Sequence, residues 1–346
     1  MNKAGCGCSG KPQGQCVPAA EPSAQAIRPL STAISWRDVL GGWGVRWGFR
    51  RMRYLMAPGL YRIGQPEANS PVLVTANYKL TVDTVRRSLT GLNVWLLVLD
   101  TNGVNVWCAA GKGTFGTEEL VRRIQATSLA GIVEHRKLVL PQLGAVGVAA
   151  HEVKRATGFS VHYGPVRASD IPAYLAAQMR AAPAMRRVTF DWKDRLTVAP
   201  MEIAGAFKPT LVILAILALL DLVRHHRVTP HLAIDMAPFL AAVLTGGLLV
   251  PLLLPWLPSR FFALKGAVAG LLLAAALLLL SPMGIAEGAG IALLVLAITA
   301  YMAMVFTGAT TFTTLAGVRV EVRRALPFIL ISAGAGAILR VAGAFI

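Results

Sequence analysis

The pattern of apolar and polar positions divides the chain into two unlike halves. From residue 204 onward, five long apolar runs follow one another, near 207–223, 236–257, 262–280, 285–306 and 326–344. A helix rises about 1.5 Å per residue, so about 20 apolar residues cross a hydrocarbon core of about 30 Å. Only helices satisfy all backbone hydrogen bonds within one segment in lipid. We therefore expect a five-helix transmembrane domain over 204–346.

The preceding half alternates short apolar runs with stretches of helical spacing. Buried strands are expected at 71–75, 93–99, 137–140 and 159–163. Helices are expected at 79–89, 118–129, 151–157 and 170–180. This alternation predicts a Rossmann-like α/β domain with a parallel sheet. Ligands of such sheets bind outside the carboxyl ends of the strands.

Composition supports this division. The chain has 346 residues, 55% of them hydrophobic, and a net charge of +17. This composition excludes a single soluble globule, a disordered chain and a disulfide-stapled miniprotein. We expect a tail over 1–35, a cytosolic α/β domain over 36–200 with its core at 70–180, and the membrane domain after it.

The charges of the short loops predict the orientation of the helices. Five cationic residues flank loops on one side of the membrane, and three lie on the other. The first group is Arg260, Lys265, Arg319, Arg323 and Arg324, and the second is Arg224, Arg227 and Arg340. This bias places the first domain in the cytoplasm, the helices in the inner membrane and the C-terminus outside. The acidic residues Asp221, Asp235 and Glu287 lie at helix ends, which favours an anchor or assembly platform over a transporter with a regulatory domain.

Residues 36–63 interleave three tryptophans with arginines. Such a stretch is typical of a segment on an anionic membrane surface. Packing of the tryptophans against the next domain is an alternative. Nucleic acid is not expected as a partner, because no nucleic-acid-binding motif accompanies the stretch.

Three of the four cysteines, Cys6, Cys8 and Cys16, lie in a polar N-terminal segment without the apolar run of a secretory signal. We therefore expect reduced thiols in a cytoplasmic tail. Together they are a candidate site for a soft metal ion such as Hg(II), and the alternative is a tail with no bound metal.

The fourth cysteine, Cys108, follows the second expected strand in the segment Gly103-Val-Asn-Val-Trp-Cys-Ala-Ala-Gly-Lys-Gly113. Asn105 can begin a short helical turn here and Gly111 can end it. The turn lies above the strand ends, so the cysteine faces the expected ligand crevice. The neighbouring loops contain neither a GxGxxG nor a Walker pattern, so a nucleotide is not favoured.

The segment 105–112 resembles the cap-helix signature of the HgcA family of mercury-methylating corrinoid proteins, which is related to the corrinoid iron–sulfur protein large subunit. The likeness continues through 58–61, 74–79, 111–117, 141–144, 163–167 and 185–190, and the five C-terminal helices fit the same family. The resemblance implies a corrinoid-binding domain whose cofactor is held base-off under the cap helix.

The resemblance implies that Cys108 is catalytic, as the lower axial ligand of cobalt. A thiolate is a soft, strong donor to such a metal. The implied activity is a membrane-anchored, corrinoid-dependent methyltransferase that moves a methyl group from methyl-cobalt to Hg(II) and forms methylmercury. The alternative is a corrinoid methyl carrier of one-carbon metabolism, with mercury methylation as a side reaction.

The resemblance also implies the cofactor-binding residues and partners. The cap segment supplies Asn105, Val106, Trp107, Cys108, Ala109, Ala110, Gly111 and Lys112. From their place at the sheet edge, we add Thr75, Asn77, Gly144, Gly147, Tyr163 and Gly164 as candidates to hold the corrin or its tail. The implied partners are a ferredoxin-like reductant with two 4Fe–4S clusters, and a methyl donor protein or the methyl-folate pathway. The basic stretch 180–195 is a candidate docking surface for the reductant or a lipid-headgroup belt.

Overall fold

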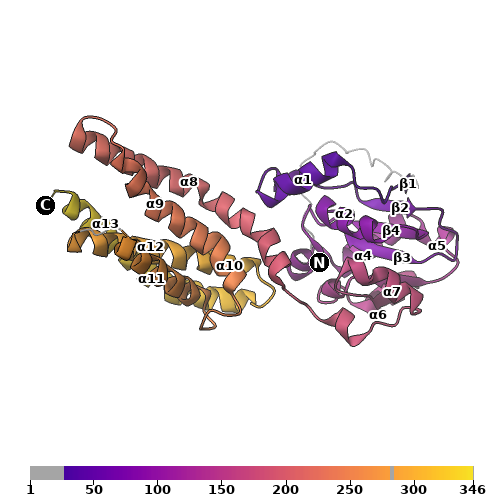
Figure 1. Cartoon of the computed structure of the whole chain (residues 1–346). Helices are drawn as coiled ribbons and strands as arrows, with labels where there is room; N and C mark the ends of the chain where they lie inside the picture. Colours follow the sequence, from indigo (N-terminus) through magenta and orange to yellow (C-terminus); the bar gives the residue numbers. More distant parts are fainter. Residues whose placement is uncertain (1–26, 281–283, 346) are drawn as a thin grey trace, which may run out of the picture. The chain divides into compact units, whose positions relative to one another are not determined.

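The computed structural model describes residues 27–280 and 284–345, and these form two compact units. The α/β unit contains Met56–Met179 with a short preceding segment, and the helical unit contains Ala33–Leu55 and the chain from Arg180 onward. Both are drawn in Figure 1. Ala33–Leu55 thus lies in the helical unit, whereas the sequence pattern suggested an α/β domain starting at residue 36.

The α/β unit is built on a six-stranded sheet in the order β1-β2-β4-β3-β5-β6. Its strands are β1 (Arg28–Pro29), β2 (Gly59–Ile63), β3 (Val72–Ala76), β4 (Val94–Leu99), β5 (Lys137–Leu140) and β6 (Ser160–Tyr163). The four strands expected from the sequence run parallel, which confirms the predicted fold class. Strand β2, which the sequence pattern did not predict, pairs antiparallel with β4. Its five residues lie within 36–63, where the arginines and tryptophans suggested a segment on the membrane surface.

Helices connect the strands of this sheet. They are α2 (Lys79–Ser88), α3 (Val106–Lys112), α4 (Thr117–Ala126), α5 (Leu129–Ile132), α6 (Ala150–Thr157) and α7 (Ile171–Ala176). The chain leaves β3 through α2 to β4 on one side, and then returns to β5 on the other side of β3. The strand order therefore reverses at β3. Such a switch point opens a crevice at the carboxyl ends of the strands.

Strand β3 separates the core from this crevice. Val72, Val74 and Ala76 belong to the main apolar cluster, together with residues of α3, α4 and α6. Successive side chains of a strand point to opposite faces. Leu73 and Thr75 therefore point to the other face of the sheet, which α2 covers.

Two expected helix ends differ from the structure. Helix α3 ends at Gly113, whose φ of 82° suits a residue without a side chain, and not at Gly111. Helix α4 begins at Thr117, one residue before the expected start at 118. The Thr117 hydroxyl accepts a hydrogen bond from the backbone N–H of Ala149 at 2.9 Å.

The helical unit begins with α1 (Trp36–Arg46) and the single turn η1 (Arg51–Arg53). The long helices are α8 (Trp192–His225), α9 (His231–Leu244), α11 (Phe262–Leu280), α12 (Ile285–Phe306) and α13 (Leu315–Phe345). A π-helical turn over Thr245–Leu249 extends α9 into α10 (Val250–Leu253). In the described part of the chain, five helices are long and apolar enough to cross a membrane, as the sequence predicted.

Helices α8 and α13 are longer than their apolar runs. Helix α8 starts at Trp192, although its run starts near 207, and α13 starts at Leu315, although its run starts near 326. Near the other end of α13, Arg340 forms ion pairs with Asp235 of α9 at 2.7 Å and with Glu287 of α12 at 3.0 Å. This arginine therefore links three helices of the unit.

Candidate ligand-binding site

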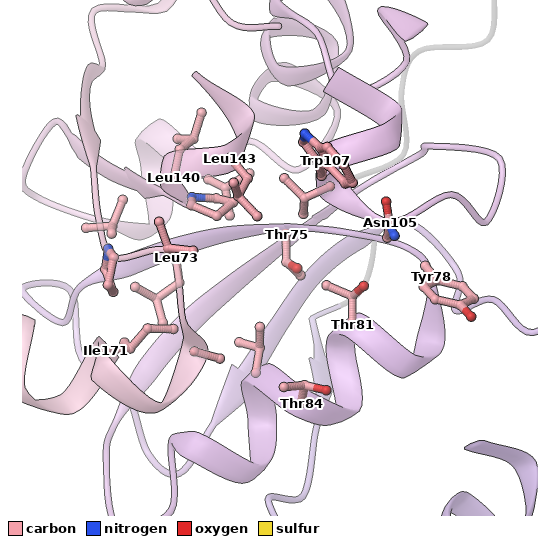
Figure 2. A pocket seen from close by; sticks show the side chains of 18 of the residues that line it. Leu73, Thr75, Tyr78, Thr81, Thr84, Asn105, Trp107, Leu140, Leu143 and Ile171 are labelled. Carbon is pink, nitrogen blue, oxygen red and sulfur yellow. The ribbon is translucent and has the colours of Figure 1, made fainter. Parts of the chain in front are cut away.

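A cavity of about 400 Å³ lies at the switch point of the sheet. It is bounded by the end of β3, the near face of α2, the start of α3, and the loops that follow β5 and β6. Figure 2 shows Thr75 between Trp107 and Leu143 on one side and Thr81 and Thr84 on the other. None of the described residues that line the cavity is charged. Its volume is in the range of ligand pockets, and its walls favour an uncharged group.

Thr75 contributes a buried hydroxyl without a hydrogen-bond partner to this wall. The residue is 2% exposed, and its hydroxyl makes no hydrogen bond to any described residue. A buried hydroxyl without a partner carries a desolvation cost of about 1–3 kcal/mol. A ligand with a hydrogen-bonding atom at this point removes that cost.

Helix α3 contains Cys108 and contributes neighbouring residues to the cavity wall. Asn105 begins the helix, and its side chain accepts a hydrogen bond from the backbone N–H of Cys108 at 2.9 Å. Val106 and Ala109 bury the inner face of the helix, so Cys108 is left exposed on the outer face. Asn105, Val106 and Trp107 line the cavity, whereas Cys108 lies one residue beyond this lining.

Asn77 holds the loop that leads into α3 and does not line the cavity. Its buried side-chain oxygen accepts hydrogen bonds from the N–H and hydroxyl of Thr101 at 3.1 and 2.9 Å and from the N–H of Gly103 at 3.0 Å. Its amide donates to Asp100 at 3.1 Å. Asn77 therefore positions the cap helix by fixing the backbone before it.

The loop after β5 packs closely behind α3. A Cβ on Gly147 would lie 2.2 Å from the carbonyl oxygen of Phe115, and a Cβ on Gly144 would lie 2.5 Å from the ring of Phe115. These two glycines allow the loop to approach the residues that follow α3. Gly144 and Gly147 are therefore closely packed and do not line the cavity.

The remaining expected residues divide between core and surface. The Tyr163 hydroxyl donates to the carbonyl of Val148 at 2.7 Å, and burial raises the pKa of this phenol. A Cβ added to Gly164 would lie 3.0 Å from the side chain of Val139, so this glycine is closely packed. Ala109 and Ala110 are buried in the core, and Gly111 and Lys112 lie exposed on α3.

Of the fourteen cofactor residues expected from the sequence, the structure brings four together at the cavity: Thr75, Asn105, Val106 and Trp107. The sequence pattern did not predict that Thr81 and Thr84 of α2, and Tyr78 directly before this helix, would also line the cavity. The sequence could have indicated this, because Thr81 and Thr84 are three residues apart in an expected helix and therefore place two hydroxyls on one helix face. Cys6, Cys8 and Cys16 lie outside the described residues.

The fold and cavity define a doubly wound α/β ligand-binding unit on a chain with five candidate membrane spans. Residues 52–175 match the family model of the CO dehydrogenase/acetyl-CoA synthase delta subunit. The acetyl-CoA decarbonylase/synthase complex subunit gamma of Methanopyrus kandleri is 42% identical over 120 residues, which are 34% of this chain and 26% of that protein. The corrinoid/iron-sulfur protein large subunit of Moorella thermoacetica is 33% identical over 122 residues, which are 35% of this chain and 27% of that protein.

These similarities are confined to the α/β unit of the chain. The chain spans about a quarter of the length of the curated relatives it matches. The matched segment begins and ends near the limits of the α/β unit. The relationship therefore rests on the unit that contains the cavity and α3.

Proposed function

We propose that this chain is a membrane-anchored corrinoid protein of the mercury-methylating family, which transfers a methyl group to Hg(II). The observation that carries the proposal is the position of α3. This helix exposes a thiol beside an uncharged cavity, in a unit similar to the large subunit of a corrinoid/iron-sulfur protein. When bound, the corrinoid supplies a cobalt centre that carries the methyl group and releases it to Hg(II).

The residues present fit such a cofactor, held base-off. The cavity has the size and apolar walls to bury the heterocyclic end of a displaced nucleotide tail. Thr75 offers that end an unused hydroxyl deep in the wall. Thr81 and Thr84 add two further hydroxyls on the opposite side.

Cys108 is the residue that acts on the metal in this proposal. Its thiolate would hold the cobalt as a soft donor, and electron donation from this ligand would favour transfer of the methyl group to a soft electrophile. Asn105 and Asn77 act as positioning residues, because they fix the start of α3 and the loop before it.

The proposal includes an electron donor, a source of the methyl group and the side of the membrane on which the α/β unit lies. The exposed arginines after the α/β unit, Arg180, Arg186 and Arg187, suit an acidic electron donor. We propose a ferredoxin-like protein with two 4Fe–4S clusters as that donor, and a methyl donor protein or the methyl-folate pathway as the methyl source. The α/β unit would lie in the cytoplasm, below the inner membrane.

The second candidate is a corrinoid methyl carrier of one-carbon metabolism. The names of the relatives favour it, since several are subunits of the acetyl-CoA decarbonylase/synthase complex. In this case the same residues hold the cofactor, and Hg(II) receives the methyl group only as a side reaction.

The test is methyl transfer from the methylated, corrinoid-loaded full-length chain to Hg(II). We expect methylmercury from the wild type and none from Cys108→Ala. Wild-type rates in Cys108→Ala would overturn the axial role of the thiolate. A wild-type chain that exchanges methyl groups with a methyl-folate donor but not with Hg(II) would favour the second candidate.

A further inference from the structure

Helix α1 carries an apolar stripe that no described residue covers. Trp36, Leu40, Trp43 and Trp47 recur at spacings of four, three and four residues, so they lie on one side of the helix. Their exposed fractions are 67, 60, 57 and 38%. Three tryptophans on the open face of one short helix form a surface that suits an apolar environment.

The opposite side of α1 is fixed to the protein. Gly42 and Val45 are buried, and an added Cβ on Gly41 would lie 2.6 Å from the hydroxyl oxygen of Tyr54. The Tyr54 hydroxyl in turn donates to the carbonyl of Asp38 at 3.3 Å. The helix also has a capping box at its start. The stripe therefore faces outward because the other face is held in place.

Contacts with α8 indicate where this stripe lies along the membrane-spanning helix. Helix α1 packs against α8. In η1, just after α1, the Arg51 guanidinium contacts the sulfur of Met201 and interacts with the charge of Glu202. The apolar run of α8 begins directly after these residues, near residue 204. The segment therefore meets α8 where the polar part of that helix ends.

The charge of the segment selects one kind of partner. Residues 36–55 contain five arginines and a single acid, Asp38, which is engaged in the capping box. The Arg37 guanidinium lies 5.4 Å from the centre of the Trp36 ring. Phe49 and Met52 extend the exposed apolar surface into the following turns. Tryptophan beside arginine is typical of segments at the headgroup level of an anionic bilayer.

We propose that α1 and η1 form an in-plane segment that binds the anionic headgroup layer of the membrane crossed by α8 and the later helices. The tryptophans enter the boundary between headgroups and acyl chains, and the arginines meet lipid phosphates. The proposal is independent of the corrinoid chemistry. It assigns the 36–55 segment a role at the membrane surface, in the same unit as the spans.

Hydrogen exchange of the full-length chain tests this proposal. The chain is reconstituted into vesicles of phosphatidylcholine alone, or of phosphatidylcholine with phosphatidylglycerol. Amide exchange over residues 36–53 should slow by about tenfold when the anionic lipid is present. A variant with Arg37→Gln, Arg50→Gln and Arg53→Gln should lose this dependence on lipid charge.

A matched control removes three exposed charges from the α/β unit: Arg87→Gln, Lys154→Gln and Arg155→Gln. It should retain the slowing over 36–53. A second variant, Trp36→Ser with Trp43→Ser, should exchange quickly in both lipids. Unchanged exchange in α11 and α12 shows that a variant is folded.

Two results would overturn the proposal. One is equal exchange over 36–53 in the two lipid compositions. The other is an undiminished effect of phosphatidylglycerol in the Arg37→Gln, Arg50→Gln and Arg53→Gln variant, which would show that these arginines do not contact the anionic lipid.

Discussion

Thr75 is the residue at which the structure leaves a hydrogen-bonding group unused inside an apolar wall. Thr75→Val keeps the shape and removes the unpaired hydroxyl. We expect the free energy of unfolding of the cofactor-free chain to rise by about 1 kcal/mol, because the buried polar group is gone. Corrinoid affinity should fall by roughly fivefold to tenfold, because the cofactor loses a partner. Thermal unfolding and corrinoid titration measure the two effects.

Thr101→Val is the matched control for this prediction. The Thr101 hydroxyl is also buried, but it is paired with Asn77 and with the carbonyl of Val104 at 2.7 Å. Its removal should lower the free energy of unfolding by about 1–3 kcal/mol. A loss of stability in Thr75→Val of similar size would show that the Thr75 hydroxyl has a structural partner.

Asn77 shows how a residue acts on the site without lining it. Asn77→Ala removes the acceptor of two backbone N–H groups and of the Thr101 hydroxyl. We expect a loss of about 3 kcal/mol in the free energy of unfolding, because these donors are buried. Chemical denaturation measures the loss. Asn69→Ala, an exposed asparagine bonded to Glu134, should change it by no more than about 0.5 kcal/mol.

At the scale of elements, the alternation of apolar runs predicted the parallel strands and most of the helices. Strand β5 has the predicted bounds, and β3 is shifted by one residue. Short apolar runs between helices leave few other arrangements, so periodicity is sufficient there. Strand β2 was not predicted, because the residues before it have the composition of a membrane-surface segment. It also pairs antiparallel with β4, so it does not follow the strand–helix–strand alternation from which the other strands were predicted.

The cavity was only partly predictable, for a different reason. It exists because the strand order reverses at β3, and that order depends on long-range pairing that an alternation pattern does not specify. The loops at the strand ends were identified, but the face of α2 that closes the cavity was not. Gly144 and Gly147 were identified as cofactor contacts, since a glycine in a loop has the same sequence signal for ligand approach and for close packing.

The contact between α3 and the loop after β5 gives a prediction for these elements. Gly147→Ala places a Cβ against the backbone of Phe115 and Ala110. We expect the free energy of unfolding to fall by about 2 kcal/mol, because neither backbone segment moves freely. Gly111→Ala is the control: it meets no atom within 4 Å, and helix propensity predicts a gain of up to about 1 kcal/mol. Urea titration of the two variants should therefore separate them in opposite directions.

At the scale of the whole molecule, the five spans and the distribution of charges predict that the start of α8 and the end of α13 lie on opposite sides of the membrane. A reporter fused after Ile346 should read as external, and so should one inserted in the loop between α8 and α9. A reporter in the loop between α10 and α11 should read as cytoplasmic, because Arg260 lies in this loop and Lys265 lies at the start of α11. Paired phosphatase and fluorescent-protein fusions measure this. A cytoplasmic signal after Ile346 would contradict the five-span topology.

We propose that α3 presents Cys108 to the cobalt of a corrinoid bound at the sheet edge. The most direct test compares the visible absorption spectra and cobalt contents of the anaerobically purified full-length chain and of Cys108→Ala. We predict stoichiometric cobalt in the wild type and a shifted absorption spectrum in the variant, because loss of a thiolate ligand changes the electronic transitions of the metal. A chain that holds no cobalt after reconstitution, or identical spectra in the two proteins, would contradict the account.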